Sequence, residues 1–257
     1  YNLGDYFNAE EPGVYLSQTG NKQLTWETNI QIDAALEFGL FKNRITGSVE
    51  FFRRETENMI FPDPQPGSAG EPNNQIFTNI GTMRNTGWEF GLNFGIVRSE
   101  DFTWNLGVTA TTFKNEIVEM PKDQDAIING TKRLAKGHSL YDFWLREWYG
   151  VDPTDGAPLF VQDPTKGDTT ATRVIDGKKY TTNHNNANFG YVGSSLPDVY
   201  GSIANEFKYK NLSLSTLFTY QIGGKVYDSN YALLMTSYPQ GQVLHTDILN
   251  AWKNPGD

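Results

Sequence analysis

The chain has 257 residues, a net charge of −9 and no cysteine, and 14% of its residues are aromatic. The acidic balance, without any basic patch, excludes the usual nucleic-acid-binding surfaces, and the missing cysteines exclude disulfides, cysteine zinc sites and thiol nucleophiles. The mean hydropathy of −0.52 and the lack of any apolar run of about 18–20 residues exclude membrane-spanning helices. These values do not exclude a transmembrane β-barrel, because its strands present an apolar side chain to lipid only at every second residue.

The strongest pattern lies at residues 24–40, where apolar and polar side chains alternate. Even positions from Leu24 to Leu40 are mostly apolar, and odd positions from Gln23 to Glu37 are mostly polar. Side chains alternate across a strand, so this pattern predicts a strand with one apolar and one polar face. At about 3.3 Å per residue such a strand extends roughly 50 Å, whereas ordinary strands have only about 5–6 residues.

The same alternation recurs along the chain. It predicts further strands at residues 45–51, 88–96, 102–110 and 212–222, and weaker alternation adds 139–151, 157–162 and 198–209. Short links fall at residues 41–44, 97–101, 152–156 and 208–211, and long polar segments fall at 56–78, 115–138, 163–196 and 224–257. Within the last of these, residues 242–252 are predicted to form a short helix.

Regular alternation of short and long connections is typical of outer-membrane barrels, which have tight turns at one end and long loops at the other. The sequence therefore predicts an all-β fold, an antiparallel transmembrane β-barrel, with about eight strands in four hairpins. A soluble sandwich also has one wet face, so strand length and loop asymmetry carry this choice.

Four motifs occur along the chain, and the one at residues 79–89 is given first. Residues 79–89 read NIGTMRNTGWE, residues 20–27 contain Gly-Asn followed by Leu, Trp and Glu, residues 150–156 read GVDPTDG, and residues 223–228 read GGKVYD. They resemble, respectively, the N-x-G-x-x-x-N-x-G-x-E run, the start of a barrel strand, the G-V-D-P-x-x-G turn and a late strand end of SusC/RagA-type TonB-dependent outer-membrane transporters. The first motif is the most specific. Asn79 and Asn85 within it are expected to bond neighbouring backbone at the loop end of a strand.

The resemblance implies that residues 1–257 are part of one TonB-dependent-receptor β-barrel domain, the C-terminal portion of a 22-stranded plugged barrel. The signal peptide, the N-terminal plug and the segment that contacts TonB are expected to lie outside this chain. It further implies the bacterial outer membrane, contact with membrane lipid and lipopolysaccharide, and a SusD-like lipoprotein partner. Assembly of two transporter–lipoprotein pairs into a dimer is an undecided alternative. No nucleic-acid partner is expected.

The function that the resemblance implies is TonB-dependent active import of a nutrient, an oligosaccharide or a peptide, by a protein that is not an enzyme. A TonB-dependent siderophore or vitamin receptor is the alternative within transport. A soluble or surface-attached carbohydrate-binding β-sandwich is the alternative from another class. The three histidines, His138, His184 and His245, show no metal-ligand spacing, and no catalytic motif is present.

No cofactor is expected. Calcium bound by loop residues Asp152 and Asp155 is the less favoured alternative to a plain turn, because too few carboxylates converge there to supply the six to eight oxygens that calcium takes.

The two faces of the predicted strands have separate roles. The residues expected to face lipid are Trp26, Ile30, Ile32, Leu36, Phe38, Trp88, Phe90, Leu92, Phe94, Trp104, Leu106, Leu214, Phe218 and Tyr220. Those expected to face the lumen or plug are Glu27, Asp33, Glu37, Glu89 and Asn93. For these five, hydration and hydrogen bonds to the plug are favoured over contact with substrate. Trp26 and Phe38, near the two ends of one strand, suit the aromatic girdles of a membrane protein.

Residues 141–149 (YDFWLREWY) carry five aromatic side chains. Tyr141, Phe143 and Tyr149 fall at odd positions and are the candidates for substrate contact at strand ends and loops. Trp144 and Trp148 fall at even positions, where an interface girdle is the favoured interpretation.

Overall fold

A computed structural model describes residues 2–8, 11–121, 124–236, 241 and 243–256. The chain divides into two compact units. Unit 1 comprises Tyr1–Asp142 and Ser194–Gly224, and unit 2 comprises Phe143–Gly193 and Lys225–Asp257. Among the described residues, no helix has the length and apolar character needed to span a membrane.

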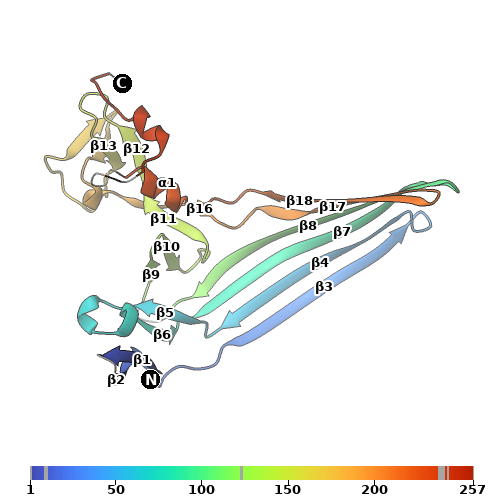
Figure 1. Cartoon of the computed structure of the whole chain (residues 1–257), viewed down its shortest axis with the longest axis horizontal. Coiled ribbons are helices and arrows are strands. Elements are labelled where there is room, and N and C mark those ends of the chain that lie inside the picture. The colour runs from blue at the N-terminus through green and yellow to red at the C-terminus, as the bar shows by residue number, and fades with distance from the viewer. Residues whose placement is uncertain (1, 9–10, 122–123, 237–240, 242, 257) are drawn as a thin grey trace. The chain divides into compact units, whose positions relative to one another are not determined.

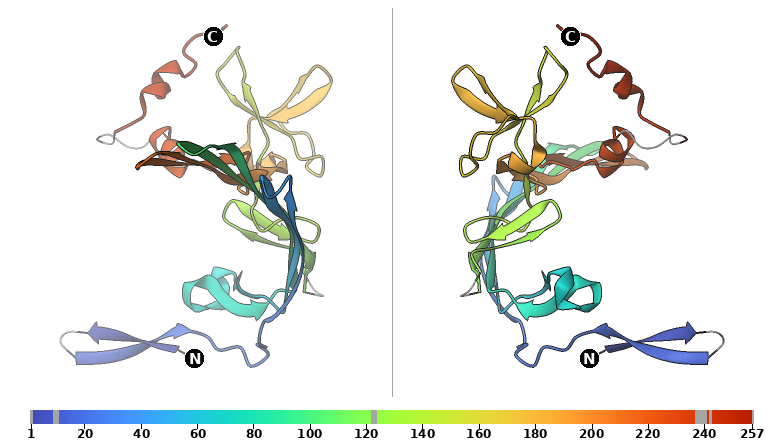
Figure 2. Two further views of the ribbon diagram at one scale, coloured as in Figure 1. Left: turned by 90° about the vertical axis from the view of Figure 1, so that its right-hand side faces the viewer. Right: turned by 90° about the vertical axis from the view of Figure 1, so that its left-hand side faces the viewer.

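Unit 1 is dominated by a six-stranded antiparallel sheet (Figure 1) with the order β18-β17-β8-β7-β4-β3. Its strands are β3 (Thr28–Leu40), β4 (Ile45–Glu57), β7 (Thr82–Arg98), β8 (Phe102–Glu119), β17 (Val199–Tyr209) and β18 (Leu212–Ile222). The six strands keep their chain order in the sheet, with long connections between β4 and β7 and between β8 and β17. The two views of Figure 2 show that this sheet is curved rather than flat.

The register aligns the alternation of all six strands. Val49 of β4 lies opposite Leu36 of β3 on one side and Phe90 of β7 on the other, and Phe90 lies opposite Ala110 of β8. A bulge at Gly95–Val97 shifts the end of β7. Because paired residues point to the same side of a sheet, one face is apolar and the other polar.

The strand limits differ from the sequence-based expectation. The strand predicted at 24–40 begins only at Thr28, so Trp26 and Glu27 precede it. In contrast, β4, β7 and β8 run well beyond the predicted strands 45–51, 88–96 and 102–110. Backbone pairing continues there although the simple alternation has ended. The predicted hairpin 139–151 and 157–162 does not join this sheet, so among the described residues the main sheet has six strands rather than the eight expected.

Three hairpins complete the description of unit 1. They are β1 (Asn2–Asn8) with β2 (Glu11–Gln18), β5 (Ile60–Pro64) with β6 (Gln75–Asn79), and β9 (Ala126–Asn129) with β10 (Lys132–Ala135). The 3-10 helices η1 (Gly67–Ala69) and η2 (Pro72–Asn74) lie between β5 and β6. In Figure 1 the hairpins β5–β6 and β9–β10 lie at the end of the sheet opposite the tight turns that join β3 to β4 and β7 to β8.

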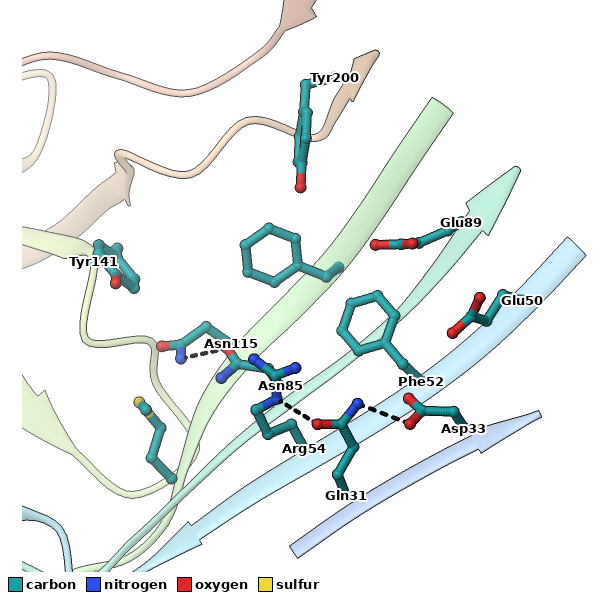
Figure 3. Close-up of a pocket in the computed structure, with 12 residues that line it drawn as sticks. Gln31, Asp33, Glu50, Phe52, Arg54, Asn85, Glu89, Asn115, Tyr141 and Tyr200 are labelled. Atoms are coloured by element: carbon teal, nitrogen blue, oxygen red, sulfur yellow. Dashed lines mark hydrogen bonds between the residues drawn. The ribbon is translucent and has the colours of Figure 1, made fainter. Parts of the chain in front are cut away.

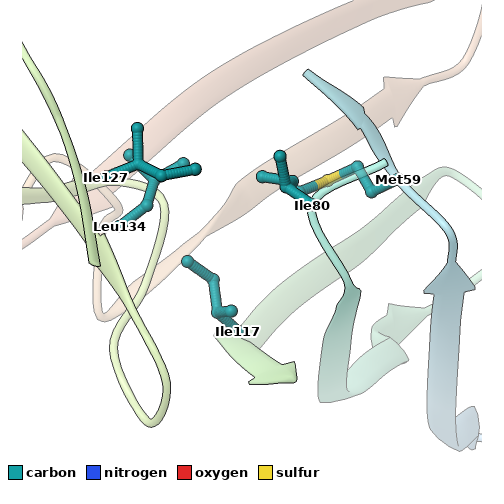
Figure 4. Packing of buried hydrophobic residues seen from close by; sticks show 5 residues of the cluster. All are labelled: Met59, Ile80, Ile117, Ile127 and Leu134. Carbon is teal, nitrogen blue, oxygen red and sulfur yellow. The ribbon is translucent and has the colours of Figure 1, made fainter. Parts of the chain in front are cut away.

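The buried core of unit 1 lies where β7 and β8 lead into these hairpins (Figure 4). It consists of Met59, Ile80, Ile117, Ile127 and Leu134. Ile80 and Ile117 are each only 1% exposed. The best-buried side chains therefore hold the hairpins to the sheet, whereas the sheet itself leaves its apolar side chains uncovered.

Unit 2 contains a small sheet with the order β12-β13-β15-β14. Its elements are β11 (Asp142–Arg146), β12 (Trp148–Val151), β13 (Pro158–Val161), β14 (Thr172–Ile175), β15 (Lys178–Thr181), η3 (His184–Asn186), β16 (Phe189–Ser194), α1 (Ser229–Leu234) and η4 (Thr246–Asn250), of which β11 and β16 cross the boundary with unit 1. The predicted turn at 152–156 joins β12 to β13, as expected. Within the predicted helix 242–252, residue Gln242 lies outside the described residues and η4 covers only the middle.

Candidate functional site

The apolar face of the six-stranded sheet is a broad uncovered surface. Leu36, Leu212, Leu214 and Phe218 on this face are each at least 60% exposed. Soluble monomers rarely leave so large a contiguous apolar patch open to water. All the strand residues expected to face lipid share this face, as the pairings of β3, β4, β7, β8, β17 and β18 show. Trp26 precedes the sheet and is 91% exposed.

Aromatic pairs lie towards both ends of this apolar face. At the end near the long loops, Phe51 and Trp88 meet edge to face with their ring centroids 5.2 Å apart. At the end near the tight turns, Trp104 and Phe207 stack at 5.5 Å. Aromatic side chains at two levels are the arrangement found at the two interfaces of a membrane.

Beyond the Phe51–Trp88 pair the same face becomes charged. Glu55 of β4 accepts hydrogen bonds from Arg53 and Arg84, each at 2.8 Å. Lys114 of β8 pairs with Glu116 at 2.8 Å. These ion pairs occupy the parts of β4, β7 and β8 that extend past the predicted strands. The apolar band therefore has a sharp boundary within continuous strands.

The polar face of the sheet contains a hollow of about 430 Å³ (Figure 3). Side chains from β3, β4, β7, β8 and β17 line it, together with one residue of the segment before β11. They are Gln31, Asp33, Glu50, Phe52, Arg54, Met83, Asn85, Glu89, Phe113, Asn115, Tyr141 and Tyr200. Charged, amide and aromatic groups thus converge on one wall, as in sites that orient a polar ligand.

Hydrogen bonds order one side of this hollow. Arg54 donates from Nε to the Gln31 side-chain oxygen at 3.1 Å, and Gln31 donates to Asp33 at 2.7 Å. The chain of bonds, drawn in Figure 3, crosses from β4 to β3 and connects a cation to a carboxylate through an amide.

Asn115 fixes the other side of the hollow. Its side chain is 3% exposed and donates to the Asn85 oxygen at 2.8 Å. Its own oxygen accepts bonds from the Ser139 hydroxyl at 2.8 Å and the Leu140 amide at 2.9 Å. Asn85, expected to bond neighbouring backbone, instead bonds this side chain. The buried amide therefore ties the segment that carries Tyr141 to the sheet.

Two carboxylates in the hollow face one another. Glu50 of β4 lies directly opposite Glu89 of β7 in the register. Like charges directly opposite on one face of a sheet are unfavourable. The sequence did not reveal this pair. The alternation shows which residues of one strand share a face, but it does not show which residues of two strands lie opposite each other.

The residues expected to face the lumen or plug fall in three places. Asp33 and Glu89 line the hollow described above, and Glu37 and Asn93 line a shallower one of about 310 Å³ on the same face. Glu27 lies before β3 and accepts a hydrogen bond from the Ile60 backbone amide at 2.7 Å. Four of the five thus share the polar face, and the fifth caps a backbone group of β5.

The three aromatic residues expected to touch substrate are dispersed. Tyr141 lines the hollow of unit 1. Phe143 is buried, with 8% of its surface exposed, while Tyr149 is half exposed in unit 2. The strand pattern is interrupted at residue 147, between β11 and β12, so the expected odd–even alternation does not continue across it. Trp144 and Trp148, also in unit 2, pack against Tyr191 and Phe160 with centroids 4.7 and 5.2 Å apart.

The turn at 152–156 is held by a cationic side chain. The Arg173 guanidinium on β14 pairs with Asp152 and, at 2.6 Å, with Asp155. Hydrogen bonds from Thr154 and the charge of Arg173 hold the pKa of the Asp152 carboxyl below its usual value. The bond from Arg173 acts likewise on the pKa of Asp155. An arginine thus occupies the space between the two carboxylates considered as calcium ligands.

A curved antiparallel sheet with one uncovered apolar face, aromatic pairs towards both ends and one polar face is a section of a β-barrel wall. The family model described as TonB dependent receptor-like, beta-barrel matches residues 2–231, and the chain belongs to this family. The resemblance to the SusC/RagA type is confirmed by this family model and by the relatives described next, and a solved structure shows the same fold.

Two curated relatives and one solved structure show how much of the family's length is present. The chain is 30% identical over 255 residues to TonB-dependent receptor P3 of Formosa agariphila, covering 93% of this chain and 24% of that protein. It is 30% identical over 142 residues to TonB-dependent receptor SusC of Bacteroides thetaiotaomicron, covering 54% of this chain and 14% of SusC. The structure of the RagAB peptide transporter superposes with a TM-score of 0.80 at 24% identity, over 99% of this chain and 28% of that one. The chain therefore spans well under a third of each.

Proposed function

We propose that the protein containing this chain imports a nutrient actively across the bacterial outer membrane, with energy delivered through TonB. Unit 1 forms part of the barrel wall, with its apolar face in lipid and its polar face towards the lumen or plug. The work of the protein is selective binding and gating, without a chemical step on the nutrient.

The dimensions of the apolar band support the membrane location in this proposal. On β7 the apolar row runs from Trp88 to Val97, which lies opposite Trp104 beyond the bulge. At about 3.3 Å per residue this row is roughly 30 Å long. A strand tilt of about 40° reduces its height to roughly 23 Å, close to the apolar band of about 25 Å in outer-membrane barrels. The aromatic pairs and the ion pairs then fall where headgroups and water begin.

The resemblance to the SusC/RagA type and the names of the relatives support a proposal for the nutrient and the partner. RagAB is described as a peptide transporter, and SusC is named a TonB-dependent receptor. We therefore propose a peptide or an oligosaccharide as cargo and a SusD-like lipoprotein as the partner at the cell surface. TonB would act through segments outside this chain.

The test is extraction of the complete protein from membranes in mild detergent, followed by intact mass and identification of co-purifying proteins. We expect a chain about four times longer than this one, as the 24% coverage of the Formosa relative implies, with a bound lipoprotein. A water-soluble species near 28.9 kDa without a partner would contradict both the membrane location and the partnership.

A further inference from the structure

Unit 2 contains a cavity of about 830 Å³ that the barrel wall does not explain. It is lined by residues of β12, β13 and β15, of the segment that follows β13, and by Asn188 just before β16. Its size lies within the range of about 300–1,000 Å³ typical of small-molecule sites. All the lining residues belong to unit 2, so the cavity is complete within one compact part of the chain.

One wall of the cavity is a rigid aromatic surface. Tyr149 is 50% exposed, and its ring centroid lies 4.1 Å from that of Tyr180, which is only 5% exposed. Burial raises the pKa of the Tyr180 hydroxyl, so this ring stays neutral at physiological pH. A half-exposed ring backed by a buried one offers a flat apolar face with little conformational freedom to lose on binding.

Gln162 organises the opposite wall. Its side chain is 6% exposed, and its amide nitrogen lies 3.3–3.4 Å from the carbonyl oxygens of Lys166 and Gly167 and a carboxylate oxygen of Asp168. Its side-chain oxygen is buried and has no hydrogen-bond partner among the described residues. A buried acceptor left unpaired is unfavourable, and a ligand hydroxyl is a donor that would satisfy it.

The carboxylates of the cavity are already engaged. Asp163 accepts bonds from the backbone amide and hydroxyl of Thr165 at 2.8 and 2.7 Å. Asp168 accepts two bonds from Lys179, at 2.9 and 2.7 Å. The charge of Asp168 is therefore balanced by Lys179, whereas Asp163 is held by neutral donors and keeps its negative charge near Lys166.

An excess of positive charge remains in the cavity. Besides Lys179, both Lys166 and Lys178 line it, and within the part of the chain that the structure describes neither forms an ion pair within 4.0 Å. The charge of Lys166 acts on Asp163, so the ammonium group of Lys178 is the one in excess, and it favours an anionic ligand.

We propose that this cavity binds an acidic saccharide, with the sugar ring against Tyr149, the carboxylate at Lys178 and a hydroxyl donating to Gln162. A saccharide supplies all three features in one small unit. An acidic peptide supplies the charge, but its acidic residues do not combine a ring and a hydroxyl in one small unit. The binding does not depend on import, because unit 2 holds every residue involved.

The experiment uses the complete protein in detergent and titrates it calorimetrically with a short oligogalacturonate. The fully methyl-esterified oligomer, which has the same rings without the charge, is the matched control ligand. We expect the acid to bind about tenfold more tightly than the ester at low salt, and added salt to reduce the difference because it screens exposed charges. Equal binding of both ligands, or binding of neither, would overturn the proposal. So would preferential binding of a glutamate-rich peptide.

Variants place the binding in this cavity. Tyr149→Ala is expected to weaken binding of the oligogalacturonate about five- to tenfold, through loss of ring contact. Lys178→Gln is expected to weaken binding of the acid about three- to tenfold, through loss of one exposed charge. It should leave binding of the ester unchanged. Lys22→Gln, an exposed lysine of unit 1, is the control and should have no effect. If Lys178→Gln and Lys22→Gln behave alike, the cavity is not the site.

Import is measured separately, as growth of cells on the natural nutrient. Normal growth with Tyr149→Ala together with weakened oligogalacturonate binding would support the site and leave the transport function intact. Failure of the wild-type protein to support growth, with binding retained, would contradict the proposed import alone.

Discussion

Gly81 shows how a single residue decides the junction between sheet and hairpin. Its φ angle is 109°, a conformation that L side chains rarely adopt. Its backbone oxygen accepts a bond from the Met59 amide at 3.0 Å. A Cβ atom at this position would collide with the backbone oxygen of Glu119. The glycine of the motif at 79–89 therefore allows two chain segments to approach closely beside the buried cluster.

Gly81→Ala is expected to destabilise the protein by at least about 2 kcal/mol, because backbone strain and a clash with backbone add together. The control is Gly70→Ala, where φ is 70° and no atom lies within 4 Å of the added Cβ. That variant is expected to lose only about 1–2 kcal/mol of stability, from the backbone strain of an L residue at positive φ. Thermal unfolding in detergent, followed by circular dichroism, measures both. Equal losses would mean that the approach to Glu119 is not limiting.

Asn79, in the same motif, marks what the sequence could predict at the residue scale. It was expected to bond neighbouring backbone, and its side chain donates to the carbonyl oxygens of Thr25 and Asn58 at 3.0 and 2.6 Å. Asparagine at a strand end commonly does this. The Glu50–Glu89 pairing could not be predicted in the same way, because it depends on which strand lies beside which and in what register.

At the scale of elements, alternation identified every strand of the main sheet, and it failed where the environment changes along a strand. The outer part of β4 carries Arg53 and Glu55 on the face that is apolar further along. A period-two pattern of hydrophobicity cannot follow a strand across such a boundary. It also assigned residues 139–151 to the wall, although the short β11 and β12 belong to other sheets.

The two faces of β7 give a paired prediction. Leu92→Arg places a charge on the proposed lipid face near the middle of the band and should cost about 2–4 kcal/mol and block insertion. Asn93→Arg, one residue on, lies on the polar face and should be tolerated far better. Each variant is folded into lipid vesicles, and the yield of folded protein is measured from its heat-dependent shift in gel mobility. Equal damage from both substitutions would count heavily against a barrel wall.

The turn between β12 and β13 gives a prediction about acid. The lowered pKa values of Asp152 and Asp155 mean that their ionised forms are favoured by folding. Their contribution is thus fully present above the unfolded value of about 3.9 and is lost as pH falls through the folded pKa. Arg173→Met should increase hydrogen exchange of the turn at pH 6, and the difference from wild type should shrink at pH 3.

Lys178→Met is the control, because it removes a lysine of the same small sheet that forms no ion pair among the described residues. It should leave exchange of the turn unchanged at both pH values. An Arg173→Met effect that is as large at pH 3 as at pH 6 would show that Arg173 acts by packing rather than through the two carboxylates.

At the scale of the whole molecule, the asymmetry of the connections predicts which end of the barrel faces the outside. The chain contains no cysteine, so single cysteines introduced here can be labelled individually. Ser68→Cys, in η1 between β5 and β6, should react in intact cells with a maleimide that cannot cross the membrane. Glu100→Cys, in the tight turn between β7 and β8, should react only after the outer membrane is opened. The reverse pattern would invert the proposed orientation.

What the sequence could not supply at this scale is the cargo. The polar hollow takes its residues from five strands and a loop, and the cavity of unit 2 takes its residues from several short ones. Each group comes together only through long-range pairing. The family motifs lie in turns and strand ends, where backbone geometry restricts the choice of residue, and they therefore identify the architecture rather than the ligand.

The direct pairing of β8 with β17 has a consequence for how the protein can evolve. Glu119 ends one strand and Val199 begins its neighbour, yet the two strands keep one uninterrupted register. Closing a longer flexible loop costs only about 0.6 kcal/mol for each doubling of its length. Loops within the segment between these strands can therefore change length at little thermodynamic cost, whereas its parts that carry Ile127 and Leu134 are fixed by packing in the buried core. Pairing β8 with β17 is instead expected to be a late step of folding, because such distant contacts form slowly.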